Sequence, residues 1–530
     1  MNKEHTQPSV DAVVKEDISK RDIIENNNQP AYSLFSQEYK ESVKRDVSQQ
    51  DILKEWNQLS EEQRKPYIEK AQVNATKSKA IVHTVFLSLL VDLFAFTLIL
   101  PLFPRLLNYY RVNGKEEIVL NYASQLLDRF KQLTNNHTGS DKWDTVLLGG
   151  LVGSLFSFLQ FIVSPIIGRA SDRIGRRRVL LYTMAGNILS TLIWLFAHSF
   201  NLFLIARVVA GLSEGNVQLS TAIISDVTAA DQRSKNLALV GIAFAIAFTL
   251  GPPIGAWFAS IDLSVLCPTL AQFGIYPYSM AAFIGLALLI IETAYLYAKL
   301  PETVHNQQRT QPETEANTVQ IALLDIQRRL STLITLKRLM GIFSFVFSGM
   351  EFTLVFLTFD VLDFSHMQQG KLLSYMGIVS ALIQGGYVRR SVQRMGEKNI
   401  VIQGMIMGVI GFYCLAVTAN ASYPFLWLYI GATCLAFTSG TVVSGLTALA
   451  SLQCHETRDD YLSKGRALGG FRSYGQLGRA LGPISVCAFY WMFGPEKCYA
   501  AGSLMMMATT WLTILGIPNR RISSIHKKAQ

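Results

Sequence analysis

Twelve apolar runs, most of them close to twenty residues long, fill the chain from about residue 81 onward. A helix needs about 20 residues to cross the ~30 Å apolar core of a bilayer, and only helices or closed barrels satisfy their own backbone hydrogen bonds there. The sequence therefore predicts an all-α membrane protein with twelve transmembrane helices. The predicted spans are about 81–103, 146–168, 179–199, 202–224, 237–259, 278–299, 338–359, 371–388, 400–419, 424–450, 466–490 and 499–517.

Basic residues are spread unevenly over the loops between these runs, in a chain with a formal net charge of +10. The densest cluster is GRASDRIGRRR, residues 168–178, whereas the short loops near residue 200, at 260–277 and near residue 420 contain neither Lys nor Arg. Loops rich in Lys and Arg stay on the cytoplasmic side. The pattern predicts that both termini are cytoplasmic, in the plasma membrane or an internal membrane such as the nuclear envelope. It also explains the positive charge without nucleic acid.

Sequons and cysteines add further expectations. Asn136 and Asn420 begin sequons on the predicted outer side, so each is a candidate glycosylation site. Cys267 and Cys498 fall in predicted outer loops, where they either form a disulfide or, as we favour, stay free thiols. No spacing of Cys and His resembles a metal site, so we expect no metal and no cofactor.

The chain repeats itself on either side of a polar linker. RIGRRRVLL at 173–181 recurs as RMGEKNIVI at 394–402, and a Gly-Pro pair recurs at 251–252 and 482–483. Matching motifs at matching positions predict two six-helix halves with a substrate site between them near the middle of the membrane. The predicted domains are a disordered tail (1–29), a helical module (30–75), a six-helix bundle (80–300), a linker (301–336), a second bundle (337–518) and a basic tail (519–530).

The linker contains most of IALLDIQRRLSTLITLKRL, residues 321–339. Its apolar residues recur at helical spacing and its basic residues lie on the other face. This pattern predicts either an amphipathic helix on the inner membrane surface or a solvated linker helix.

Three motifs resemble those of the major facilitator superfamily. Residues 168–178 resemble its loop between helices 2 and 3, although Ala170 replaces the usual Leu, and RVVAG at 207–211 resembles its helix-4 motif. GIAFAIAFTLGPPIGA at 241–256 resembles the helix-5 motif of its proton-coupled antiporters. The resemblance covers about residues 80–520 and implies the twelve-helix fold of two pseudo-symmetric bundles. The matching motif residues are Gly168, Asp172, Arg173, Gly175, Arg176, Arg177, Gly251, Pro252, Pro253 and Gly255.

Three further stretches resemble the tetracycline-transporter-like (TETRAN) subgroup more narrowly. They are LPET at 300–303, EFTLVFLTFD at 351–360 and QQGKLLSYMGIVSALIQGGYVRR at 368–390. Transport of organic anions and drugs is associated with this subgroup, so the resemblance implies a small organic substrate.

Two arginines within the eleventh span are candidates for substrate contact. Charges inside a membrane are costly and usually functional, and a guanidinium group pairs well with carboxylates. We expect Arg479 first and Arg472 second to contact an anionic substrate. The alternative is a structural ion pair with an acid such as Asp92 or Glu351.

Several acids within the spans are candidates for proton coupling, since a carboxyl group in a low-dielectric cavity gains and loses protons near neutral pH. We expect Glu351 and Glu214 first, then Asp92, to bind protons. A static pair of Glu214 with Arg207, seven residues earlier on the same helix face, is the alternative. By resemblance, Arg207 takes part in coupling. Glu292 lies near the inner end of its span, where we expect it to extend to the surface.

The resemblance also assigns roles to the two longest motifs. Asp172 would lock the inner gate by pairing with nearby arginines and with the positive N-terminal end of the eleventh helix. The glycines and prolines at 251–255 would kink the fifth helix, allow close packing and prevent leakage during antiport.

The segment 30–72 resembles part of an HMG box. Its residues Phe35, Tyr39, Trp56, Pro66 and Tyr67 match that core pattern. HMG boxes bind the DNA minor groove, but residues 1–79 hold 13 basic and 14 acidic side chains, so little affinity for phosphate is expected. We favour a protein partner or a degenerate remnant over nucleic acid.

These observations predict a secondary transporter of small organic anions or drugs, driven by exchange with protons. No nucleotide-binding loop and no nucleophile with a paired base is visible, which argues against an ATP-driven pump or an enzyme. Two alternatives stay open. One is an uncoupled facilitator of the same cargo, and the other is a membrane scaffold whose N-terminal module binds a partner or DNA.

Overall fold

The computed structural model of the protein describes residues 31–32, 34–36, 38–39, 49–99, 102–113, 121–122, 125, 129, 132, 141–259, 276, 278–303, 316–364, 366–454 and 461–518. The chain forms two compact units, residues 1–81 and 82–530. In the described part, every regular element is helical. The predicted tails at 1–29 and 519–530 lie outside the described residues.

The first unit is built on a small aromatic core. Helix α2 (Gln49–Gln58) and the start of α3 (Glu61–Thr97) contribute to it. The rings of Phe35 and Trp56 lie 5.2 Å apart, and Tyr67 packs edge-on against both. A reciprocal pair starts α3: the Ser60 amide donates to Gln63 Oε1 at 3.0 Å, and the Gln63 amide donates to Ser60 Oγ. Of the residues that match the HMG-box pattern, Phe35, Tyr39, Trp56 and Tyr67 belong to this core, whereas Pro66 is exposed. Any ligand of this unit stays a prediction.

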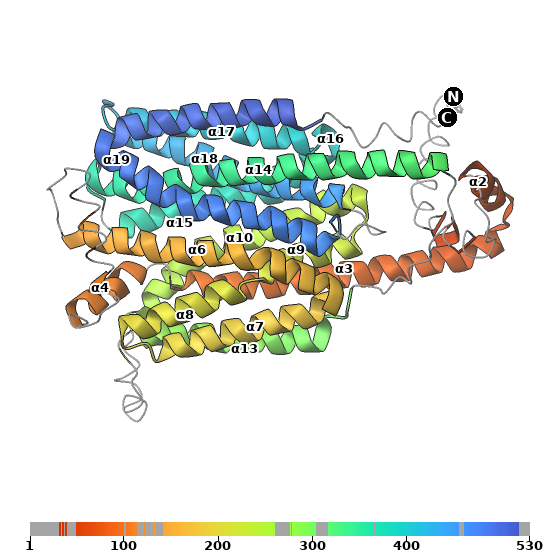
Figure 1. Ribbon diagram of the computed structural model, residues 1–530, viewed down its shortest axis with the longest axis horizontal. Coiled ribbons are helices and arrows are strands. Elements are labelled where there is room, and N and C mark those ends of the chain that lie inside the picture. The colour runs from red at the N-terminus through yellow and green to blue at the C-terminus, as the bar shows by residue number, and fades with distance from the viewer. Residues whose placement is uncertain are drawn as a thin grey trace, which may run out of the picture. The chain divides into compact units, whose positions relative to one another are not determined.

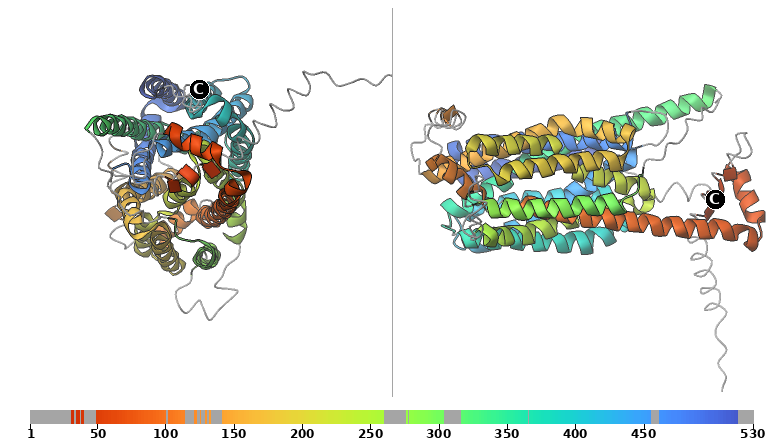
Figure 2. Two further views of the ribbon diagram at one scale, coloured as in Figure 1. Left: turned by 90° about the vertical axis from the view of Figure 1, so that its right-hand side faces the viewer. Right: turned by 90° about the horizontal axis from the view of Figure 1, so that it is seen from below.

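The second unit is a bundle of long helices that lie side by side (Figure 1) and are seen end-on in the left view of Figure 2. Its first half begins with the part of α3 after residue 81, and its second half begins with α14. The first half contains α4 (Phe103–Asn113), α6 (Asp141–Ile174), α7 (Arg176–Leu195), α8 (Phe200–Ser213), α9 (Asn216–Val227), α10 (Ala230–Ala259) and α13 (Ser279–Lys299). The second half contains α14 (Ala316–Asp360), α15 (His366–Leu382), the π-helix η1 (Ile383–Val388), α16 (Arg389–Met395), α17 (Glu397–Thr418), α18 (Pro424–Gln453) and α19 (Lys464–Gly516).

Among the described residues, ten helical segments are long and apolar enough to cross a membrane. Two predicted spans fall outside this set: α15, with 17 residues, and the first part of α19, which carries Arg472 and Arg479. Helix α19 contains two spans because Gly494 turns the chain, with φ 83° and ψ 170°, a conformation that favours glycine. The helices thus lie where hydropathy predicts twelve spans, and the protein is a multi-pass membrane protein.

Helix α14 differs from the prediction for the linker. Residues 316–360 form one continuous helix of 45 residues, so the stretch around 321–339 is the first part of a spanning helix and not a separate helix on the membrane surface. Figure 1 shows this part of α14 projecting beyond its neighbours. The physical reason is the absence of a helix breaker, since no Gly or Pro occurs between residues 316 and 340.

The two halves share local geometry at the repeated motif. Gly175 and Gly396 both have positive φ (113° and 80°), and each precedes the first residue of a helix, α7 or α17. Two residues later, Arg177 donates to the carbonyl of Tyr297 near the end of α13. The equivalent Lys398 donates to the carbonyls of Ile514 and Ile517 at the end of α19. A basic residue therefore neutralises the C-terminal carbonyls of the last helix in each half.

Candidate functional site

Six charged side chains from both halves form a connected row inside the bundle, here called the charged row. Electrostatic interactions link each member to at least one other. In the first half, the acids come from α3, from the residue after α8 and from α13. In the second half, the row continues with two arginines of α19 and one acid of α14. Its members are Glu292, Asp92, Glu214, Arg472, Arg479 and Glu351.

Asp92 is held by a chain of hydrogen bonds. Asn216 Nδ2 donates to Asp92 Oδ1 at 2.7 Å, and Thr183 Oγ1 donates to Asn216 Oδ1 at 3.0 Å. Asp92 and Asn216 are buried, with 5% and 2% of their surface exposed. Sequence reasoning missed Asn216, because an uncharged amide in an apolar run carries no signal until its partner is known.

Glu292 lies in the interior, contrary to the prediction that it extends to the surface. Only 2% of its surface is exposed, and Ser88 Oγ donates to its Oε1 at 2.6 Å. The second carboxylate oxygen is buried without a hydrogen-bond partner. Position along the span was misleading because the face of α13 that carries Glu292 turns toward α3 and its residue Ser88.

The fourth predicted span is broken at Glu214 and Gly215, between α8 and α9. Glu214 has an extended backbone (φ −71°, ψ 98°), and its side chain is hydrogen-bonded to Asn187. Gly215 is needed for packing, since a Cβ there would lie 2.9 Å from the side chain of Thr183. Interrupted helices near the middle of the membrane are typical of substrate and ion sites in transporters.

The second half of the row depends on close contact between α14 and α19. A Cβ on Gly478 would lie 2.4 Å from the carbonyl oxygen of Gly341, and one on Gly482 would lie 2.5 Å from that of Phe345. These glycines bring the helices together and place Glu351 of α14 near Arg479 of α19. Both charged side chains are exposed, and charged residues at membrane depth face the bundle interior or water rather than lipid.

Arg207 lies apart from the acids. Its guanidinium group lies over the rings of Trp194 (5.8 Å) and Phe203 (5.5 Å), and Tyr110 and Tyr276 are its electrostatic neighbours. Glu214 instead has Arg472 as its basic neighbour. The seven-residue spacing suggested a pair with Arg207, but aromatic neighbours surround that arginine.

The GRASDRIGRRR motif lies at one end of the bundle, here called the motif end. Asp172 Oδ1 accepts the Gly465 amide at 2.9 Å, and Asp172 Oδ2 accepts the Arg466 amide at 2.8 Å and Ser463 Oγ at 2.7 Å. Its Oδ1 also pairs with Arg176 Nη1 at 2.7 Å. The carboxylate thus caps the first turn of α19 and pairs with Arg176. This helix end and a nearby arginine are the partners that the sequence predicts for Asp172.

Further contacts at the motif end were not predicted. Asp226 at the end of α9 pairs with Arg176 Nε at 2.9 Å and with Lys464 Nζ at 3.3 Å. From α10, Arg233 donates to the carbonyl of Ser451, and Ser234 Oγ donates to Glu397 Oε1. These side-chain contacts join first-half and second-half helices and close the motif end. A charge at a predicted span end gave no clue to these partners.

Glycines also set the contact between α6 and α19 at this end. A Cβ on Gly168 would lie 2.2 Å from the carbonyl oxygen of Gly465, and one on Gly469 would lie 2.7 Å from that of Ser164. Of the remaining motif residues, Gly175 supports the positive φ described above, and Arg173 is exposed.

The helix-5 motif lies against the end of α3. A Cβ on Gly251 would lie 1.9 Å from Thr97 Oγ1, and one on Gly255 would lie 2.3 Å from the carbonyl oxygen of Leu98. Pro252 and Pro253 lie within α10, which continues as a helix through them. The close packing expected of the glycines is present, while a role in sealing against leakage stays a prediction.

The modification sites are only partly described. Asn420 is exposed between α17 and α18, and its side-chain amide donates to Glu496 at 2.7 Å. Asn136 and Cys267 lie outside the described residues. Cys498 was expected in an outer loop, but it lies in the last part of α19, fully buried and free. The loop is shorter than predicted because the helix resumes directly after Gly494.

Comparison with known proteins gives concordant matches. A sequence model of the Major Facilitator Superfamily matches residues 85–483. Major facilitator superfamily domain-containing protein 10 of Mus musculus is 35% identical over 447 residues, which cover 81% of this chain and 91% of that protein. Tetracycline resistance protein, class C, of Escherichia coli is 25% identical, over 64% and 79% of the two chains. The crystal structure of the human organic anion transporter MFSD10 (TETRAN) is similar with a TM-score of 0.69 and 32% identity, covering 82% of this chain and 99% of that chain.

Proposed function

Since the chain belongs to the major facilitator superfamily and is a membrane transporter rather than an enzyme, we propose that it exchanges small organic anions for protons. The observation that carries this proposal is the charged row, which runs from one half of the bundle into the other. Because the row is continuous, a proton bound at one end and a substrate bound at the other would interact electrostatically.

The proton side of the proposal rests on charge balance. The row holds four carboxyl groups and two guanidinium groups, and buried charges are stable only when they are paired. Protons bound to the acids of the first half balance the excess negative charge. Asp92 and Glu214 are the proposed coupling residues, because both interact with Arg472, and Glu292 joins them. Arrival of an anion at Arg472 would compete with these carboxylates and alter their protonation.

The substrate side rests on Arg479 and Arg472. Arg479 is exposed and Arg472 partly exposed, and a guanidinium group offers a fork of N–H donors to a carboxylate or sulfonate. The similar human protein is named an organic anion transporter, and the bacterial relatives are named for tetracycline. An anionic or zwitterionic organic molecule suits both the names and the arginines.

The decisive measurement is flux of labelled organic anions into proteoliposomes, with and without an imposed pH gradient. For Glu214→Gln we expect gradient-driven flux to fall at least about tenfold, because the lost charge can no longer be exchanged for a proton. Exchange of labelled for unlabelled substrate at equal pH should persist. Glu496→Gln, the same chemical change at an exposed acid outside the row, should alter neither flux.

Arg479→Ala tests the substrate side separately. We expect a rise of at least about tenfold in KM for anions, with Arg479→Lys intermediate since it keeps the charge but loses the fork. Flux of anions that is saturable but indifferent to pH in the unaltered chain would replace antiport with facilitated diffusion. Absence of flux for every anion and drug tested would favour the scaffold alternative.

A further inference from the structure

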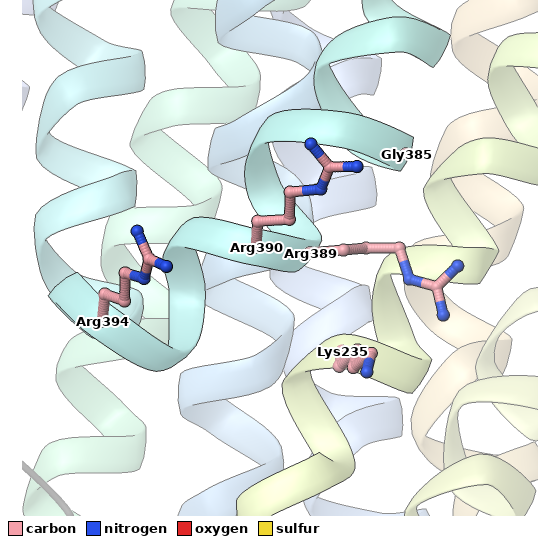
Figure 3. A pocket seen from close by; sticks show the side chains of 5 residues that line it. All are labelled: Lys235, Gly385, Arg389, Arg390 and Arg394. Atoms are coloured by element: carbon pink, nitrogen blue, oxygen red, sulfur yellow. The ribbon is translucent and has the colours of Figure 1, made fainter. Parts of the chain in front are cut away.

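Four basic side chains surround a cavity of about 640 Å³ at the motif end, open to solvent (Figure 3). Lys235 comes from α10 in the first half of the bundle. The other lining residues come from the second half: Gly385 of η1 and Arg389, Arg390 and Arg394 of α16. Figure 3 shows Arg389 reaching from α16 toward α10. Among the described residues, no acidic side chain lines this cavity.

Among the described residues, the four cavity cations contrast with the basic residues that close the motif end, which have partners. Arg176, Arg233 and Lys464 each form an ion pair or donate a hydrogen bond. Across the described residues, neither an ion pair nor a side-chain hydrogen bond engages any of the cavity cations. Arg389 Nε is also buried without an acceptor. Like charges held close together repel, so an anion placed among these side chains would relieve their repulsion.

The local fold creates both the space and the convergence of charge. Residues 383–388 form a π-helix, a wider turn that is often found at functional sites. Gly385 contributes no side chain to the cavity, and the nearest side-chain atom to a Cβ there would be Ile242 Cδ1 at 3.8 Å. Arg390 and Arg394, one turn apart in α16, share a helix face.

We propose that this cavity binds an anion that carries two or more phosphate groups, either the headgroup of a phosphorylated lipid or a soluble polyphosphate. Guanidinium groups form paired N–H donations to phosphate oxygens, and a cluster of three arginines and one lysine suits several phosphates. The volume lies in the range of sites for whole small molecules, so a single phosphate ion would leave most of it empty.

The position of the cavity gives such a ligand a consequence for the conformation. It touches α10 in the first half and η1 and α16 in the second half, and these helices already pack through Ala238, Val388 and Val392. Its neighbour Ser234 donates to Glu397 across the same contact. An anion bridging Lys235 and Arg389 would therefore add to the contacts that close the motif end and would slow its opening.

Binding is tested on the full chain in nanodiscs, separately from any transport measurement. The probes are discs of phosphatidylcholine with or without phosphatidylinositol 4,5-bisphosphate, soluble inositol hexakisphosphate, inorganic phosphate and citrate. We expect a rise in melting temperature with the lipid or with inositol hexakisphosphate, and little effect of citrate or inorganic phosphate. Response to the lipid alone identifies a headgroup site, and response to the soluble compound identifies a free polyphosphate.

Variants show whether the binding belongs to this cavity. Arg389→Gln and Arg394→Gln should each raise the Kd by about tenfold or more, since each removes charge-assisted hydrogen bonds. The Kd of Arg389→Lys should lie between that of Arg389→Gln and that of the unaltered chain. Arg178→Gln, which removes an exposed charge of α7 outside the cavity, should leave the Kd unchanged. Equal binding of all variants, equal binding of citrate, or no binding of either phosphorylated probe overturns the proposal, whatever the transport assay shows.

Discussion

At the scale of single residues, Asp172 joins three parts of the motif end. Its carboxylate accepts two backbone amides and one hydroxyl from α19 or the residue before it, and it pairs with Arg176 of α7. Hydrogen bonds to a charged group contribute about 1.5–3 kcal/mol each, net of the hydrogen bonds to water that they replace. All three of the α19 contacts break when α6 and α19 separate. Asp172 therefore stabilises the closed conformation and not the fold of either helix.

Cys454 is a native reporter of that separation. It lies at the end of α18, and burial raises the pKa of its thiol to about 12, although Arg233 and Lys464 act in the opposite direction. The thiolate is the reactive form, so the thiol should react slowly with a maleimide near pH 7.5 while the motif end is closed. Opening would hydrate the thiol and return its pKa toward the ordinary value.

We expect Asp172→Asn to speed maleimide labelling of Cys454 by about tenfold or more. A loss of about 1.4 kcal/mol in the closed state changes the population ratio tenfold, and the asparagine keeps the size while losing the charge. Labelling rates are read by mass spectrometry, with Cys454→Ser to identify the peptide. Arg178→Gln, a nearby charge change on the exposed face, is the control. Equal labelling rates in the unaltered chain, Asp172→Asn and Arg178→Gln would mean that Asp172 does not hold this end closed.

Single residues of the candidate site were predictable only where charge stands out against an apolar background. That rule found Asp92, Glu214, Glu351, Arg472 and Arg479, all members of the charged row. It could not choose partners, since partners come from helices distant in sequence. It therefore placed Glu292 at the surface and offered a pair between Glu214 and Arg207.

At the scale of helices, small residues decide which pairs approach closely. The α6–α19 contact brings Gly168 and Gly465 so near that a methyl group on either would overlap the other's backbone oxygen. The backbone cannot give way as a flexible side chain can. The contact therefore depends on the two glycines, as in other close helix pairs in membranes.

Gly168→Ala should lower the maximal rate of transport by about tenfold with little change in KM. Overpacking costs typically 1–3 kcal/mol, and here the cost falls on the closed state through which each cycle passes. The matched control is Gly153→Ala on the same helix, where a Cβ would have no neighbour within 4 Å. Similar rates for the two variants would contradict a cycle that needs α6 and α19 in contact.

Hydropathy predicts the existence of the helices well, because the bilayer sets a length and demands internal hydrogen bonds. Hydropathy does not predict where a helix is interrupted within the membrane, or how far it continues outside the membrane. The interruption between α8 and α9 contains a single glycine, which many continuous helices tolerate. The first part of α14 is polar enough to resemble a linker, yet it continues the spanning helix.

At the scale of the whole molecule, we expect transport to depend on the bundle and not on the first unit. The unit at residues 1–81 has its own aromatic core around Trp56. A transporter needs only the bundle, so a chain lacking residues 1–75 should retain flux within about twofold. Trp56→Ala, which removes about 3–5 kcal/mol of core packing, should do the same. Loss of flux in both chains, at normal amounts in the membrane, would show that the first unit is required for transport.

The duplicated halves predict that the motif end opens as one event. Two separate contacts close it: Asp172 with the start of α19, and Glu397 with Ser234 of α10. If the halves rock as rigid bodies, weakening either contact shifts one shared equilibrium.

Reporter cysteines at Ser164, on the α6–α19 side, and at Ala238, on the α10–α16 side, are buried in the closed state. Asp172→Asn and Glu397→Gln should each speed labelling at both reporters by the same factor, and the double variant should multiply the two factors, because independent contacts add in free energy. Labelling that rises only at the reporter beside each altered residue would instead mean that the helices part locally, and alternating access would then need a bending motion within each half.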